Sequence, residues 1–271
     1  MGTSIDKYSR VDSGAELGDG VVVGAFAIVE GGVVIGEGSK IHPQAVIRRG
    51  TKMGKGCEVH SGAVLGGEPQ DTKFKGEESF LEIGDNTVVR EHATLHRASG
   101  EGCVTRVGSG CMLMAGTHVG HNGKVGDRVV MANLATLGGF VEVGENAFVG
   151  GMAGAHQFVR IGAYVMAGGG SVILEDIPPY MMVTGGYRPP VCGLNRIGLM
   201  RAGFSEEARK AIHKAYRILY REAESTQEAV ALMKERLGGS AEVQKLVAFL
   251  EAGTGRGFAS CRRRDCGETR S

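Results

Sequence analysis

The chain has 271 residues, of which 46 are Gly, 6 are Pro and none is Trp. A hydrophobic fraction of 42% is too high for a disordered chain, and the scarcity of Pro without a Gly-X-Y period excludes collagen. The formal net charge of +1 gives no global reason to expect nucleic acid as a partner.

Segments that direct a protein into a membrane or out of the cell can be recognised in a sequence and predict its location. The sequence contains no run of about 18 apolar residues, the length that a membrane span needs, and its first residues lack the apolar stretch of a secretory signal. The six cysteines show no CxxC spacing, which in a chain of this length is typical of reduced thiols rather than a disulfide framework. We therefore expect a cytoplasmic protein without an integral membrane segment.

Aliphatic residues recur every six positions from Val11 to Ile173. Of the 28 positions in this phase, 25 are apolar. A helix repeats every 3.6 residues and a strand every two, so a period of six indicates a short strand followed by a corner. Three such hexads close one coil, and stacked coils bury the repeated aliphatic side chain. Residues 5–177 are therefore predicted to form a parallel β-solenoid of about nine coils.

Two segments interrupt the hexads without changing their phase. They lie near residues 66–82 and 97–106, and we expect both to project from corners of the solenoid, where inserted loops commonly carry function. Beyond the repeat, Ser205, Ser225 and Ser240 each precede a segment with helical periodicity. Residues 178–252 are predicted to form a small helical domain, and residues 253–271 a disordered tail.

Histidines are concentrated in the middle third of the chain. His118 and His121 share the segment HVGHNG, and His156 follows about two coils later. Asp71 and Lys73 lie in the first projecting segment. Several histidines at polar corner positions close to a charged loop indicate a candidate catalytic site.

Four motifs occur together and in a fixed order: Gln70-Asp71-Thr72-Lys73, the segment REHATLHR at 90–97, HVGHN at 118–122, and AHQF at 155–158. With the hexads and the helical end, they make residues 5 to 250 resemble the acyl-carrier-protein-dependent UDP-N-acetylglucosamine O-acyltransferases of lipid A biosynthesis. The hexads alone would indicate only the wider superfamily of hexapeptide acyltransferases. The resemblance implies a left-handed β-helix and a homotrimer with active sites between subunits, neither of which the periodicity itself shows.

The resemblance also implies a reaction and the residues that carry it. An (R)-3-hydroxyacyl group would move from acyl-carrier protein to the glucosamine 3-hydroxyl of UDP-N-acetylglucosamine, with no metal and no cofactor other than the thioester substrate. His121 matches the general base and the backbone N–H of Gly139 the oxyanion donor. These two residues are three hexads apart, so the length of one coil places them one above the other. Asn122 follows the base and is a candidate for orienting its ring.

Other matched positions concern binding. Contacts to the sugar nucleotide are implied for Asp71, Lys73, His118, His156 and Gln157, and contacts near its uridine-phosphate end for Asn195 and Arg201. Gly169 matches a position that limits acyl length, and a glycine there predicts a longer acyl chain.

The chain departs from the family pattern at four positions. Asn122 replaces a common Asp, Phe140 and Tyr187 replace common histidines, and Ala202 replaces a common Arg. Because these changes bear on sugar specificity, a 3-amino sugar nucleotide remains an alternative acceptor.

Further alternatives remain open at this stage. They are a zinc enzyme of the carbonic-anhydrase type with His118, His121 and His156 as ligands, an acyltransferase that uses another sugar nucleotide, and a non-catalytic solenoid. Four basic residues on the first long helix form a stripe that could dock an acidic carrier protein or face solvent: Lys210, Lys214, Arg217 and Arg221.

Overall fold

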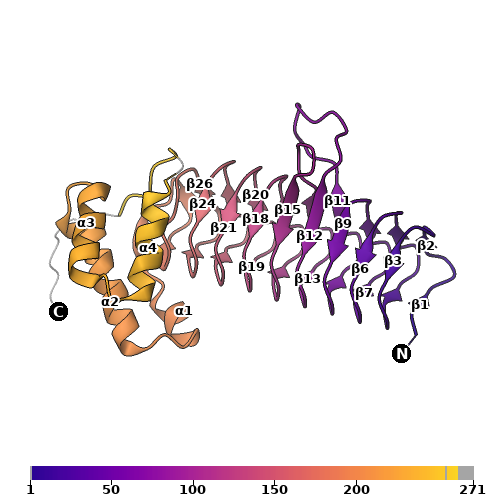
Figure 1. The fold of residues 1–271 in the computed structure, drawn as a ribbon, viewed down its shortest axis with the longest axis horizontal. Coiled ribbons are helices and arrows are strands. Elements are labelled where there is room, and N and C mark those ends of the chain that lie inside the picture. The colour runs from indigo at the N-terminus through magenta and orange to yellow at the C-terminus, as the bar shows by residue number, and fades with distance from the viewer. Residues whose placement is uncertain (1, 254, 262–271) are drawn as a thin grey trace.

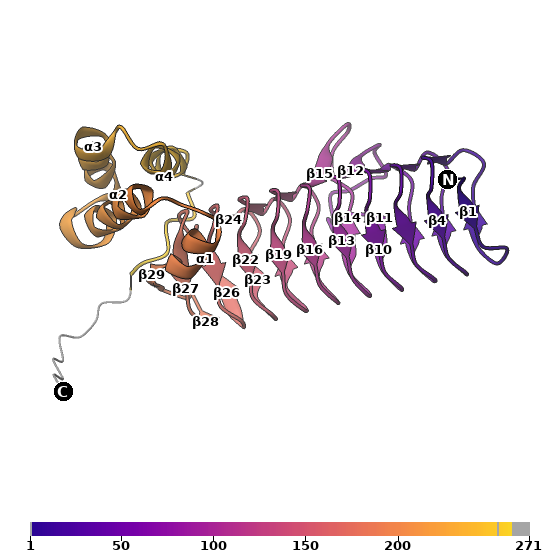
Figure 2. The ribbon, with the colours of Figure 1, turned by 90° about the horizontal axis from the view of Figure 1, so that it is seen from below.

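The hexads fold into the predicted solenoid. The computed structural model describes residues 2–253 and 255–261, and in it each hexad forms a short strand followed by a tight corner (Figure 1). Successive coils pair in parallel with an offset of three hexads, as Val22 does with Lys40, except where a projecting segment lengthens the offset. The strands form three faces of the solenoid. Seen from below, the coils make an almost straight stack from the N-terminal end to the helices (Figure 2).

The faces contain 11, 10 and 8 strands within the described residues. The strands of the first face are β1 (Ser4–Ile5), β4 (Val22–Val23), β7 (Lys40–Ile41), β10 (Glu58–Val59), β13 (Val88–Val89), β16 (Met112–Leu113), β19 (Val130–Met131), β22 (Phe148–Val149), β25 (Met166–Ala167), β27 (Met181–Val183) and β29 (Val191–Leu194).

The strands of the second face are β2 (Arg10–Val11), β5 (Ile28–Val29), β8 (Val46–Ile47), β11 (Val64–Gly67), β14 (Thr94–His96), β17 (His118–Val119), β20 (Thr136–Leu137), β23 (Gly154–Ala155), β26 (Ser171–Ile173) and β28 (Gly186–Tyr187). The strands of the third face are β3 (Glu16–Leu17), β6 (Val34–Ile35), β9 (Thr51–Met53), β12 (Phe80–Ile83), β15 (Val104–Val107), β18 (Lys124–Val125), β21 (Glu142–Val143) and β24 (Arg160–Ile161).

The core is a stack of identical positions. Val119, Leu137, Ala155 and Ile173 follow one another on successive coils of the second face, and all are buried. Glycine before a corner permits the coils to stack closely, since a Cβ on Gly120 would lie 2.8 Å from the backbone of Gly138. The hexad period is therefore the period of the core.

The two interruptions contact each other. Figure 1 shows the longer one rising from the solenoid between β11 and β12. The N–H of Gly102 in the second segment donates to the carbonyl of Glu78 in the first at 2.8 Å, and the guanidinium of Arg97 lies 5.3 Å from the ring centroid of Phe74. These contacts fix the two segments against each other.

The helical domain caps one end of the solenoid (Figures 1 and 2). Its helices are α1 (Arg196–Arg201), α2 (Glu206–Arg217), which continues into a π-helical turn at Ile218–Glu222, α3 (Thr226–Leu237) and α4 (Ala241–Glu251). Ser205, Ser225 and Ser240 are the N-caps of α2, α3 and α4, and each side chain accepts a backbone hydrogen bond. No helix in the described residues is long and apolar enough to span a membrane.

The solenoid continues beyond the predicted end at residue 177, because β27 pairs in parallel with β25 and then antiparallel with β29. A buried ion pair joins this end to the helices: Arg160 contacts Asp176 at 2.8 Å and donates to the carbonyl of Phe249 at 3.1 Å. Residues 255–261, expected in a disordered tail, instead form bridges between Asp176 and Phe258 and between Val191 and Cys261. The last coil offers unpaired backbone groups that this segment satisfies. The remainder of the expected tail, residues 262–271, lies outside the described residues.

Candidate active site

His121 lies at the corner that follows β17, and its ring is oriented by the next residue. Nδ1 of His121 is 2.9 Å from Oδ1 of Asn122. The Asn122 amide is held by the backbone of Ser99, which donates to Oδ1 at 2.9 Å and accepts from Nδ2 at 3.0 Å. Because this pair fixes which amide atom faces the imidazole, Nδ1 carries the proton and Nε2 presents its lone pair.

The same asparagine connects the site to both projecting segments. The Ser99 hydroxyl donates to Oδ2 of Asp71 at 2.9 Å, and the Asp71 Oδ1 accepts from the backbone N–H of Lys73 at 2.9 Å. The Lys73 N–H and then the Ser99 hydroxyl hold the pKa of Asp71 below its usual value. A continuous hydrogen-bonded path therefore leads from the Asp71 carboxylate to the His121 ring.

Gly139 lies on the coil next to His121, as the spacing of three hexads predicts. A Cβ on Gly139 would lie 2.5 Å from Nε2 of His121. The N–H groups on either side are engaged, that of Gly138 by Ala155 and that of Phe140 by His121, whereas within the described residues the N–H of Gly139 has no hydrogen-bond acceptor. A backbone N–H that has no acceptor among the described residues thus lies beside Nε2 of His121.

Two further histidines extend the cluster. Nδ1 of His118 lies 2.8 Å from the Thr94 hydroxyl oxygen, and the His118 ring meets the edge of His96 with centroids 4.8 Å apart. Burial, followed by the charges of His118 and His121, lowers the pKa of His96 to about 4, and burial also lowers the pKa of His118. Both rings are therefore neutral near pH 7.

His96 was missing from the site predicted from sequence. The second projecting segment lengthens the offset between Thr94 and His118 to four hexads instead of three. The regular spacing of three hexads therefore did not indicate that His96 lies near His118. Pairing the hexads on either side of that segment would have placed His96 beside His118.

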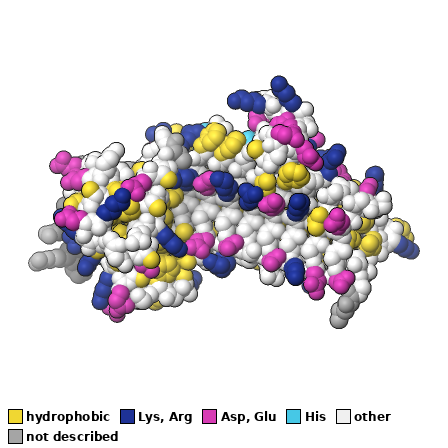
Figure 3. Space-filling model, in the orientation of Figure 1, with side chains coloured by type: hydrophobic (Ala, Val, Ile, Leu, Met, Phe, Trp, Pro, Cys, Tyr) yellow, Lys and Arg dark blue, Asp and Glu magenta, His cyan; other side chains and the backbone are white. Residues whose placement is uncertain are grey.

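Aromatic residues form an apolar wall on the same corner. Phe140, one of the departures from the family pattern, meets the His121 ring edge to face at 5.3 Å and stacks on Phe158 at 4.8 Å. The two phenylalanines are 39% and 44% exposed. Figure 3 shows apolar side chains and histidine close to the foot of the projecting loop. The His121 imidazole thus borders a partly exposed, apolar surface.

The remaining predicted residues divide into two groups. His156 and Gln157 lie one coil beyond Gly139 on the same corner, where Nδ1 of His156 is 3.3 Å from the carbonyl of Gln157. Lys73 lies in the projecting loop beside Asp71. These three residues border the site.

The other group lies elsewhere in the chain. Gly169 follows β25 and thus lies on a different corner from His121. Asn195 caps α1, accepting from the N–H of Gly198 and donating to the carbonyl of Tyr164. Arg201 is exposed at the end of α1. Within one chain, the structure does not bring these three residues to His121.

Comparisons with known proteins decide the family. Residues 176–259 match the family model described as UDP N-acetylglucosamine O-acyltransferase, domain 2, and residues 32–67 match that of the bacterial transferase hexapeptide (six repeats). The acyl-[acyl-carrier-protein]–UDP-N-acetylglucosamine O-acyltransferase of Thiobacillus denitrificans is 46% identical over 187 residues, which cover 69% of this chain and 72% of the relative. The chain belongs to the UDP-N-acetylglucosamine O-acyltransferase family.

Solved structures of this acyltransferase family agree over nearly the whole chain. The UDP-N-acetylglucosamine acyltransferase of Francisella novicida is 31% identical with a TM-score of 0.92, covering 96% of this chain and 95% of that one. The enzyme of Bacteroides fragilis is 35% identical with a TM-score of 0.88, covering 95% and 99%. The resemblance drawn from the four motifs is thereby confirmed, and the protein is an acyltransferase rather than a non-catalytic solenoid.

Proposed function

We propose that this acyltransferase transfers an (R)-3-hydroxyacyl group from acyl-carrier protein to the glucosamine 3-hydroxyl of UDP-N-acetylglucosamine in the cytoplasm, as the first step of lipid A biosynthesis. The observation that carries the proposal is the placement of His121 Nε2 directly beside Gly139 in a chain whose relatives are named for this reaction. No cofactor is needed, because the thioester itself activates the acyl group.

The chemistry requires a base and an oxyanion donor. Nε2 of His121 takes the proton of the sugar hydroxyl as its oxygen attacks the thioester carbonyl, and the N–H of Gly139 donates to the developing oxyanion. When the intermediate collapses, the C–S bond breaks and the imidazolium returns its proton to the departing thiolate. The Asn122 carbonyl oxygen, which accepts from Nδ1, holds the ring in the required tautomer throughout.

We also propose that the active enzyme is a homotrimer with each site between two subunits. Gly169, Asn195 and Arg201 lie away from His121 in the same chain, so they reach a sugar nucleotide or acyl chain there only from a neighbour. Large apolar side chains are exposed on the two corners that flank the second face; they include Leu134, Phe140, Met152 and Phe158. Burial of this surface would favour association. Light scattering coupled to gel filtration tests the trimer, and a monomer with full activity would contradict it.

An acidic carrier protein would dock beside the helical domain. A groove of about 540 Å³ between α1 and α2 is lined by cationic side chains, including Arg196, Arg209, Lys210 and Lys214. Glu206 pairs with Lys210 at 2.7 Å, so the local charge is only partly neutralised. Such a groove suits an acidic partner presenting a thioester. Charge reversal at Lys214 should raise the KM for acyl-carrier protein while leaving the KM for the sugar nucleotide unchanged.

Asn122 favours a second acceptor, a 3-amino sugar nucleotide. A neutral amide orients the imidazole but cannot stabilise the imidazolium by charge, as a carboxylate would. An amine needs less help from a base than a hydroxyl does, so the weaker dyad would suffice for N-acylation. The two acceptors differ only at the attacking atom.

Mass spectrometry of the products separates these acceptors. The enzyme is supplied with acyl-carrier proteins of several chain lengths and with either UDP-N-acetylglucosamine or its 3-amino analogue. We expect the O-acylated product. We also expect faster turnover of the longer acyl chains, because Gly169 and Gly151 leave their corner without side chains. Faster turnover of the amine would establish the second acceptor, and no product from either would overturn the proposed function.

A further inference from the structure

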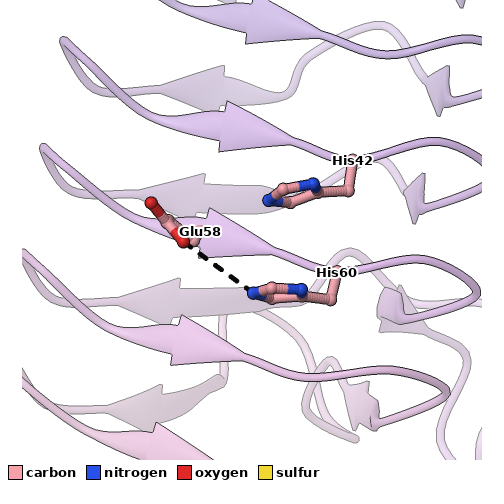
Figure 4. Close-up of side chains that lie close together, drawn as sticks. All are labelled: His42, Glu58 and His60. Carbon is pink, nitrogen blue, oxygen red and sulfur yellow. Dashed lines mark ion pairs between the residues drawn. The ribbon is translucent and has the colours of Figure 1, made fainter.

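A group of metal-ligating side chains lies at the opposite end of the solenoid from the helices, on early coils. His42 follows β7, and Glu58 and His60 lie in and after β10 on the next coil. One ligand atom from each of the three lies within 4.8 Å of the others. Figure 4 shows the two rings side by side, with the Glu58 carboxylate on the side where one nitrogen of each ring lies. This group takes no part in the acyltransferase site described above.

The coil geometry holds the two imidazoles in parallel. Their centroids are 4.4 Å apart and their planes differ by 14°. This spacing follows from the distance between coils, because His42 and His60 are three hexads apart and occupy equivalent corners. The arrangement therefore rests on backbone pairing and not on a chance meeting of flexible side chains.

The contacts of the two rings leave nitrogens for a ligand. Nε2 of His42 is buried and, among the described residues, has no hydrogen-bond partner. Nδ1 of His60 lies 3.4 Å from Oε1 of Glu91 on the following coil, while its Nε2 lies 3.8 Å from Oε2 of Glu58. A carboxylate behind the imidazole is the usual device that fixes a ligating histidine, since it makes the remote nitrogen the donor atom.

The charges around the group permit a cation. Glu58 also pairs with Lys40 at 3.0 Å, but through its other oxygen, Oε1. Arg90 pairs with Glu91 at 3.0 Å, so its charge is opposed locally.

We propose that His42, Glu58 and His60 bind one zinc ion, with Glu91 as the carboxylate that orients His60. Two imidazoles and one carboxylate are a zinc donor set, and water would complete the tetrahedron. Ligand atoms of such a site are about 3.3 Å apart, so on binding the ligand atoms approach by up to about 1.5 Å and the two parallel rings tilt toward the ion. The ion links two neighbouring coils and stabilises the N-terminal half of the solenoid.

Zinc titration of the full-length, metal-free enzyme tests the site, with calorimetry and thermal unfolding as readouts. We expect one tight site per chain and a rise in melting temperature of about 5 °C at roughly a hundredfold excess over Kd. Mg²⁺, which demands oxygen ligands, should give no shift. Absence of zinc binding by the wild-type enzyme would overturn the proposal.

Variants assign the binding to this corner. His42→Gln with His60→Gln should abolish the zinc-induced shift, Glu91→Gln should weaken binding by about 10- to 100-fold, and His213→Gln on α2 is the matched histidine control. Circular dichroism without metal verifies that each variant is folded. Anomalous diffraction at the zinc edge should show its peak between His42 and His60. A peak only at His118 and His121, or unchanged zinc binding in the double variant, would refute the site.

Discussion

Gly139 lies so close to His121 that the smallest side chain would reach the imidazole: a Cβ on the glycine would be 2.5 Å from Nε2. Gly139 is not among the residues with positive φ, so its backbone does not require glycine. In the proposed mechanism, the absence of a side chain at this position leaves the space beside Nε2 of His121 open for the attacking oxygen and the thioester carbonyl.

Gly139→Ala should consequently reduce turnover without unfolding the enzyme. In the proposed mechanism, the added methyl group would occupy the space of the attacking oxygen and displace the oxyanion donor, so we expect kcat to fall by about 10²-fold or more. Steady-state kinetics together with the melting temperature measures both effects. Gly239→Ala is the control, since a Cβ there meets nothing within 4 Å. Full activity of Gly139→Ala would show that acylation occurs elsewhere.

His121→Ala tests the base itself. General-base catalysis contributes about 10²- to 10⁴-fold, and we expect a loss of kcat in that range with the fold retained, because His121 lies on a corner outside the core. Lys124→Ala, on the neighbouring strand and exposed, should have nearly wild-type kcat. Activity within a few-fold of wild type in the His121 variant would refute its role.

Two histidines, His96 and His118, should make the free energy of unfolding depend on pH. The pKa of His96 is about 4 in the folded chain, against an ordinary value of 6.5, so the unfolded chain binds more protons between these values. Stability is therefore fully present above pH 6.5 and falls as the pH is lowered toward 4, by about 3 kcal/mol from this group. The lowered pKa of His118 acts in the same direction.

His96→Gln should flatten that dependence. Urea unfolding of the variant and the wild-type enzyme at pH 7 and pH 4.5 measures the difference, and His213→Gln serves as an exposed control. If the variant loses as much stability on acidification as the wild type does, His96 is not the group responsible.

The ion pair between Arg160 and Asp176 should hold the helical domain to the solenoid. The guanidinium donates to Asp176 through Nε at 2.9 Å and through a terminal nitrogen at 2.8 Å, and it lies 4.1 Å from the ring centroid of Phe249 in α4. Arg160→Met removes the guanidinium that contacts the buried Asp176 carboxylate, and breaking a buried ion pair costs about 3–5 kcal/mol. We expect a lower melting temperature and easier proteolysis before α2. Arg128→Met, an exposed pair with Glu145, is the control.

The sequence determined the periodic part of this protein. An aliphatic side chain every sixth residue has no buried position except on the inner side of a short strand, so the hexads alone predict the solenoid. The same spacing placed His121 below Gly139, because three hexads make one coil wherever no segment is inserted. His42 and His60 have the same spacing of three hexads, but as two separate histidines they indicated no site.

Tertiary structure decided the contacts that the six-residue period does not specify. The path from Asp71 through Ser99 to Asn122 joins two projecting segments and a corner, and its hydrogen bonds depend on loop conformations that no repeat specifies. His96 meets His118 only because the second segment returns the chain to the adjacent coil. Residues 255–261 pair with the last coil because its exposed strand edge needs partners, a requirement that exists only after the solenoid has formed.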